Sequence, residues 1–142
     1  MLRHSIFNAH KLLLLLIIVL FSSFQAVVAS EAAHEGTWTK FKAKTKGSWS
    51  ITVEGDKRYI NFNDEFKTKR APDLKIVLSP KPLANITNRN ALDGSVIISL
   101  LTSYSGAQRF EIPQDVNLED YQTLLIHCEK FTYVWSGGSL NI

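Results

Sequence analysis

Short stretches in which apolar and polar residues alternate fill most of the chain, and this pattern limits its folds more than any other feature. The alternation begins at residues 49–53 and recurs at residues 73–79. A period of two places successive side chains on opposite faces of a β-strand. No segment after residue 30 has the pattern of a long helix. The chain is therefore expected to be all-β.

Turn residues separate these stretches. Glu54, Gly55, Asp56 and Lys57 interrupt the first one, and residues 58–62 follow as the return strand of a hairpin. A polar loop is expected at residues 80–93, and one helical turn at residues 116–121. Further strands are expected at residues 73–79, 94–101, 107–112, 124–128 and 131–135. This spacing predicts a single-domain antiparallel β-sandwich or barrel.

The N-terminus differs in composition from the rest. Arg3 and Lys11 precede and flank an apolar run at residues 12–21, and small residues follow as far as Ala29. This arrangement predicts a signal peptide over residues 1–29, cleaved after Ala29. The alternative is a retained anchor, but a spanning helix needs about 20 apolar residues. We therefore expect a periplasmic or secreted protein with no membrane span after cleavage.

Two segments are expected after cleavage. Residues 30–46 form an N-terminal segment with an edge strand, and residues 47–142 form the β domain. The mature chain carries 14 basic and 13 acidic side chains, so its charge does not indicate a nucleic-acid partner. Residues 36–81 hold 11 basic and 5 acidic side chains, and residues from 82 onward hold 3 and 6. The charge is thus uneven along the domain.

Four lysines occupy every second position in the first segment, namely Lys40, Lys42, Lys44 and Lys46. On a strand they would share one face. Such a row could attract an anionic surface or partner. It could equally be an exposed edge strand that lysines protect from mispairing.

The chain has one cysteine, Cys128, so it cannot form an intramolecular disulfide. The thiol could be free, an intermolecular partner or a ligand. If residues 124–128 form a strand, Cys128 shares a face with Leu124 and Ile126, and His127 faces the other way. Cys128 and His127 could then bind one ion together only if the strand ended there. The alternative is that Cys128 is a buried core residue, with Phe131, Val134 and Trp135 nearby.

Motifs of the common enzyme classes are missing from the sequence. It contains no glycine-rich phosphate loop, no nucleophile elbow and no paired cysteines. His34 and His127 are the only histidines after the predicted cleavage, which are too few for a histidine metal cage within one chain. We do not expect a stand-alone enzyme.

Several motifs together resemble the DM-thirteen family, which is described as an electron-transfer domain. The resemblance extends from about residue 47 to residue 140. Its central part is the pair of stretches 62–68 and 71–74, followed by residues 90–95 and 106–108. The most specific part is at the end of the chain, with Leu118, Tyr121, Ile126, His127, Cys128, Phe131, Trp135, Gly137 and Leu140.

The resemblance implies a β-sandwich and a redox role centred on Cys128, with His127 beside it where many members have tryptophan. It allows a haem or metal to bind through Cys128. Relatives are often joined to DOMON domains, and no second domain is found here, so the redox partner is expected to be a separate protein. The alternative function is an extracytoplasmic binding module in which the cysteine is structural.

Overall fold

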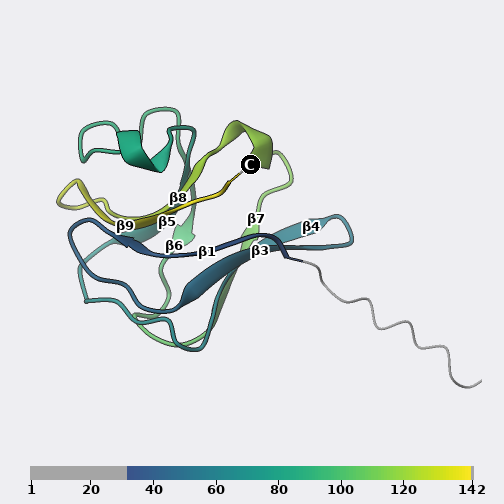
Figure 1. Cartoon of the computed structure of the whole chain (residues 1–142), viewed down its shortest axis with the longest axis horizontal. Helices are drawn as coiled ribbons and strands as arrows, with labels where there is room; N and C mark the ends of the chain where they lie inside the picture. Colours follow the sequence, from purple (N-terminus) through teal and green to yellow (C-terminus); the bar gives the residue numbers. More distant parts are fainter. Residues whose placement is uncertain (1–31, 142) are drawn as a thin grey trace, which may run out of the picture.

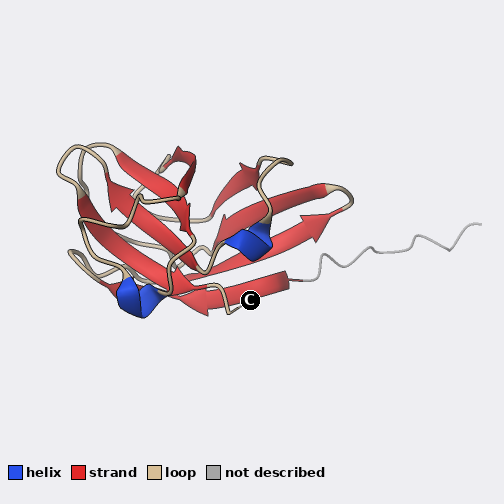
Figure 2. Cartoon of the chain, turned by 90° about the horizontal axis from the view of Figure 1, so that it is seen from above, coloured by secondary structure: helices blue, strands red, loops and turns tan. Residues whose placement is uncertain are grey.

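Two antiparallel sheets pack face to face in the computed structural model, which describes residues 32–141 (Figures 1 and 2). This confirms the all-β prediction, and of the two predicted architectures the structure has the sandwich rather than the barrel. The predicted signal peptide, residues 1–29, lies outside the described residues and remains a prediction. Within the described residues, no helix is long and apolar enough to cross a membrane.

The four-stranded sheet has the order β1-β3-β4-β7. Each strand pairs antiparallel with its neighbour. Gly55 has a φ of 64° in the turn that joins β3 to β4, a conformation that glycine adopts without steric cost. The predicted hairpin is therefore confirmed. The strands are β1 (Ala32–Thr37), β3 (Ser48–Glu54), β4 (Lys57–Phe62) and β7 (Gln108–Ile112).

The five-stranded sheet has the order β2-β9-β8-β5-β6, with β8 at its centre. Its strands are β2 (Thr39–Lys40), β5 (Leu74–Ser79), β6 (Val96–Leu100), β8 (Thr123–Cys128) and β9 (Tyr133–Ser139). Two short 3-10 helices, η1 (Leu83–Asn85) and η2 (Leu118–Asp120), lie in the connections. The second confirms the predicted helical turn.

The structure contains two separate apolar cores. The main core lies between the sheets and includes Trp49, Phe66 and Leu124. A smaller core lies on the other face of the five-stranded sheet, where Leu125 packs with Val77, Ile86, Ala91 and Val134. The loop after β5, which contains η1, supplies Ile86 and Ala91 to this second core. Every residue of β8 is therefore buried, on both faces of its strand.

Close packing around Trp49 joins the two sheets. A Cβ atom on Gly36 of β1 would lie 2.7 Å from the Trp49 ring, and one on Gly138 of β9 would lie 2.4 Å from its Nε1. Real Cβ atoms do not approach that closely, so both strands need glycine at these positions. The absent side chains make room for the largest residue of the core.

The segment before residue 47 differs from the expectation of one lysine-bearing strand. The chain forms β1 in one sheet, crosses at Trp38 and forms β2 in the other, so each strand is an outer strand of its sheet. Only Lys40 of the lysine row lies in a strand, because the chain bends after it. The burial still alternates, since Ala43 and Thr45 are buried and the four lysines are exposed.

The start of β9 also differs from expectation. The strand begins at Tyr133, and Phe131 lies in the preceding hairpin with 55 % of its surface exposed. Val134 belongs to the outer core rather than to the core that contains Cys128. Of the three apolar neighbours expected around Cys128, only Trp135 shares its core. A shift of register in β9 opposite Ile126 and His127 is the reason, because it changes which face each residue meets.

Candidate functional site

Cys128 is the last residue of β8 and lies between the first residues of two neighbouring strands. It is paired with Leu74 of β5 on one side and Tyr133 of β9 on the other. The side chain is fully buried in the inter-sheet core, on the face that Leu124 and Ile126 share, as predicted. Its thiol donates a hydrogen bond to the Pro72 carbonyl oxygen at 3.3 Å. This hydrogen bond ties the end of β8 to the turn that precedes β5.

Two strained residues flank this cysteine. Asp73 has a φ of 59° and immediately precedes Leu74, and Thr132 has a φ of 55° and immediately precedes Tyr133. Positive φ costs a residue with a side chain about 1–2 kcal/mol, and it is least suited to a β-branched residue such as threonine. Strain of this kind concentrates at functional sites. Apart from Asn141 near the C-terminus, Asp73 and Thr132 are the only non-glycine residues with positive φ in the described part of the chain.

His127 points to the opposite face of β8, as predicted. Only 1 % of its surface is exposed, and its Nε2 has no hydrogen-bond partner among residues 32–141. Burial lowers the pKa of the imidazole, and the positive charge of Lys75 lowers it further. Lys75 lies directly opposite His127 on β5 and forms ion pairs with Glu129 and, at 3.8 Å, with Asp73. The imidazole is therefore held neutral.

The two candidate residues do not converge on one ligand. Strand pairing continues through Cys128, so the thiol and the imidazole lie on opposite faces of β8. In the described part of the chain, no group of three or more histidine, cysteine or acidic residues could hold a metal ion. Neither residue lines any of the three hollows described for this surface. In this arrangement Cys128 does not fit the position of a haem or metal ligand.

The lysine row lies beside the strand that pairs with β8. The Lys42 amide donates to the Val134 carbonyl of β9 at 3.2 Å, and the Lys42 ammonium lies 4.6 Å from the centre of the Tyr133 ring. Tyr133 is the direct partner of Cys128. In Figure 1 the dark-blue segment after β1 runs next to the yellow β8–β9 hairpin. The fold thus brings the cationic segment and the cysteine to the same region.

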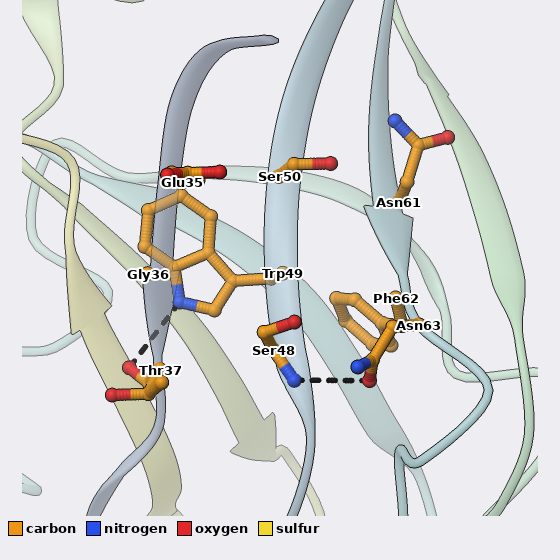
Figure 3. A pocket seen from close by; sticks show the side chains of 9 residues that line it. All are labelled: Glu35, Gly36, Thr37, Ser48, Trp49, Ser50, Asn61, Phe62 and Asn63. Carbon is orange, nitrogen blue, oxygen red and sulfur yellow. Dashed lines mark hydrogen bonds between the residues drawn. The ribbon is translucent and has the colours of Figure 1, made fainter.

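A hollow of about 580 Å³ over β1, β3 and β4, lined by both polar and apolar side chains, was not predicted (Figure 3). Ser50 lies directly opposite Asn61, and Glu35 lies opposite Ser50 on the other side. Nearby, the Ser48 amide donates to Asn63 Oδ1 at 3.0 Å. The alternation around Trp49 predicted that Ser50 faces away from Trp49, but the residues beside it became known only with the strand register. The hollow belongs to the sheet that does not contain Cys128.

Comparison with protein families gives one match. A family model described as "Electron transfer DM13" matches residues 37–136, which include the lysine row, both strained turns and Cys128. The chain belongs to this family. The resemblance found in the sequence motifs is thereby confirmed, and with it an electron-transfer-related role for the DM13 domain. No curated protein and no solved structure matches the chain.

Proposed function

We propose that this DM13 protein is an exported electron-transfer accessory whose redox role depends on Cys128. The observation that carries the proposal is the position of the family domain's lone cysteine between two strained turns, Asp73 and Thr132. The N-terminal sequence supports export, because its charged start, apolar run and small residues match a secretory signal. The redox partner of this domain would be a separate protein in the same compartment.

The strained turns give the buried thiol a route to reactivity. Leu74 and Tyr133 cover Cys128 on its two sides, and each follows directly after a residue with positive φ. Local opening at this end of the sheet would release the strain at Asp73 and Thr132, so it costs less than it would with unstrained turns. Opening would also break the thiol–Pro72 hydrogen bond and let solvent reach the sulfur.

A second function has its own supporting observation. The side chain of Cys128 has no exposed surface, and its thiol already has a hydrogen-bond acceptor. Both facts suit a cysteine that serves only in packing. On this alternative the domain is an extracytoplasmic binding module, and the hollow of Figure 3 is a candidate binding surface.

The variant Cys128→Ser separates the two functions. Serine can keep the hydrogen bond to Pro72, so we expect the free energy of unfolding to fall by no more than about 2 kcal/mol. If Cys128 has the redox role, the Cys128→Ser variant should no longer exchange electrons with the native redox partner. Ile126→Val, on the same face of the same strand, is the matched control because it removes one buried methyl group and keeps the thiol.

Equal electron exchange in wild type and Cys128→Ser would contradict the redox proposal and favour the binding module. An absorption spectrum and an intact mass of protein from its native compartment would complete the test. They would show a bound chromophore or a modified thiol. The same mass would reveal whether residues 1–29 have been removed, and a chain that still begins at Met1 would contradict cleavage.

A further inference from the structure

The tertiary structure assembles a block of four lysines that no single stretch of sequence contains. Lys46 and Lys67 form an isolated antiparallel bridge, with backbone hydrogen bonds of 2.9 and 3.4 Å in the two directions. Thr45 and Thr68, one residue further along, face inward with their hydroxyl oxygens 2.9 Å apart. Lys44 and Lys69 are the next residues along the two segments, and both are exposed. We name Lys44, Lys46, Lys67 and Lys69 the lysine block.

The lysine block is electrostatically unfavourable in the isolated domain. All four side chains are exposed, and none takes part in an ion pair within residues 32–141. Like charges directly opposite each other on paired strands are destabilising. The nearest carboxylates in sequence, Asp64 and Glu65, are exposed and form no ion pair in the same range. Lys40, Lys42 and Arg70 extend the positive surface on either side.

Protection of a free strand edge does not explain the block. Such protection requires unpaired backbone groups, and it can apply to Lys40 in the outer strand β2. The backbone of Lys46 is already paired with Lys67, and Lys67 is paired in turn with Ser105. Edge protection therefore does not account for the charges at Lys46 and Lys67.

Hydrogen bonds connect the block to the neighbourhood of Cys128. Thr68 Oγ1 accepts a hydrogen bond of 3.1 Å from the Trp135 indole, and Thr45 Oγ1 lies 2.9 Å from Ser136 Oγ. Trp135 and Ser136 belong to β9, which pairs with β8 and shares its core face with Cys128. Arg70 lies two residues before Pro72, whose carbonyl accepts the thiol hydrogen bond. A partner seated on the block would thus contact segments that are hydrogen-bonded to β9, the strand next to Cys128.

We infer that the lysine block is the docking surface for an acidic face of a separate redox partner protein. The partner's identity as a redox protein rests on the proposed electron-transfer function, whereas its negative charge follows from the block alone. Electron-transfer encounters use small interfaces and dissociate readily. Complementary charges suit them because they accelerate association without requiring a large apolar contact.

The test measures binding of poly-L-glutamate, as a defined acidic polypeptide, at low and high salt. The block variant carries Gln at Lys44, Lys46, Lys67 and Lys69. The control variant carries Gln at four cations outside the block, namely Lys57, Lys81, Arg89 and Arg109, so both variants have the same net charge. Each exposed charge contact is worth a factor of roughly two. We expect the block variant to bind about tenfold more weakly and the control to stay within about twofold of wild type.

Equal weakening in both variants would overturn the inference, because only net charge would then matter. Absence of binding by wild type would overturn it as well. Tighter block-dependent binding to phosphatidylserine vesicles than to polyglutamate would overturn the choice of a protein partner in favour of a membrane surface.

The Cys128→Ser variant should bind polyglutamate as wild type does. Failure of the redox role would therefore leave the inference of an acidic docking partner intact. If the block variant unfolds, the pair Lys44→Gln and Lys69→Gln serves in its place, with about fourfold weakening expected.

Discussion

The β3–β4 and β8–β9 hairpins have the same antiparallel pairing, but their turns carry different types of residue at the left-handed position. Between β3 and β4 the left-handed position of the turn is occupied by Gly55, whereas between β8 and β9 it is occupied by Thr132. The first hairpin satisfies the steric preference of its backbone, and the second violates it beside Cys128. The residue type thus suits the backbone conformation in the β3–β4 turn, and does not suit it in the β8–β9 turn beside the candidate site.

The strands of the two hairpins differ in burial as well. Residues of β4 alternate between the core and a polar surface, while every residue of β8 is buried. The reason is the loop containing η1, which covers the outer face of the five-stranded sheet. The β8–β9 hairpin therefore combines the most completely buried strand with a strained turn. Each prediction below tests one part of this contrast.

The largest effect is expected from alanine substitution along the central strands. Leu125→Ala empties part of the outer core, and Ile60→Ala empties part of the inner core, so each should lower the free energy of unfolding by about 2–5 kcal/mol. Asn61→Ala, on the polar face of β4, should cost no more than about 1 kcal/mol. Chemical denaturation measures all three. A loss below about 0.5 kcal/mol for Leu125→Ala would show that the second core contributes nothing.

Exchanging the turn residues tests the strain directly. Gly55→Thr places a β-branched residue at a φ of 64° and should destabilise the domain by about 1–2 kcal/mol. Thr132→Gly removes the corresponding strain at a φ of 55° and should stabilise it by about 1 kcal/mol. Thermal unfolding of both variants gives the comparison. A destabilised Thr132→Gly would mean that the threonine side chain supports the hairpin more than the strain weakens it.

The buried imidazole makes stability depend on pH. The folded pKa of His127 lies below its unfolded value, so the unfolded chain takes up the proton more readily. The free energy of unfolding should therefore fall as the pH drops below about 6.5, by at most about 1.4 kcal/mol per pH unit for this one group. Denaturation at pH 7.5 and 5.5 measures the loss, and His127→Phe should reduce it. An unchanged pH dependence in that variant would assign the effect to other groups.

The smallest effect is expected from the lysine row. Replacing Lys40, Lys42, Lys44 and Lys46 by glutamine should change the free energy of unfolding by less than about 0.5 kcal/mol per site, because all four are exposed. Denaturation of the fourfold variant is the measurement. Loss of folding would show that the alternation of exposed lysines with Phe41, Ala43 and Thr45 had been misinterpreted.

The sequence by itself determined the strand period and therefore the all-β class. It also placed Cys128 and His127 on opposite faces of one strand, because the period of two applies to any regular strand whatever its partners. The motifs between about residues 47 and 140 indicated the DM13 family. Local chemistry was enough for these results, since Gly55 and the alternation around Trp49 carry their own structural preference.

Only the tertiary structure decided what lies next to what. The crossing at Trp38, the bulge in β9 and the cover over β8 all depend on contacts between residues far apart in the chain. The positive φ values at Asp73 and Thr132 were not predicted from the sequence, because neither position carries the glycine that usually marks this conformation. In the same way, Lys46 meets Lys67 only through a bridge across 21 residues, so the sequence pattern around Lys46 did not show that Lys67 and Lys69 lie beside it.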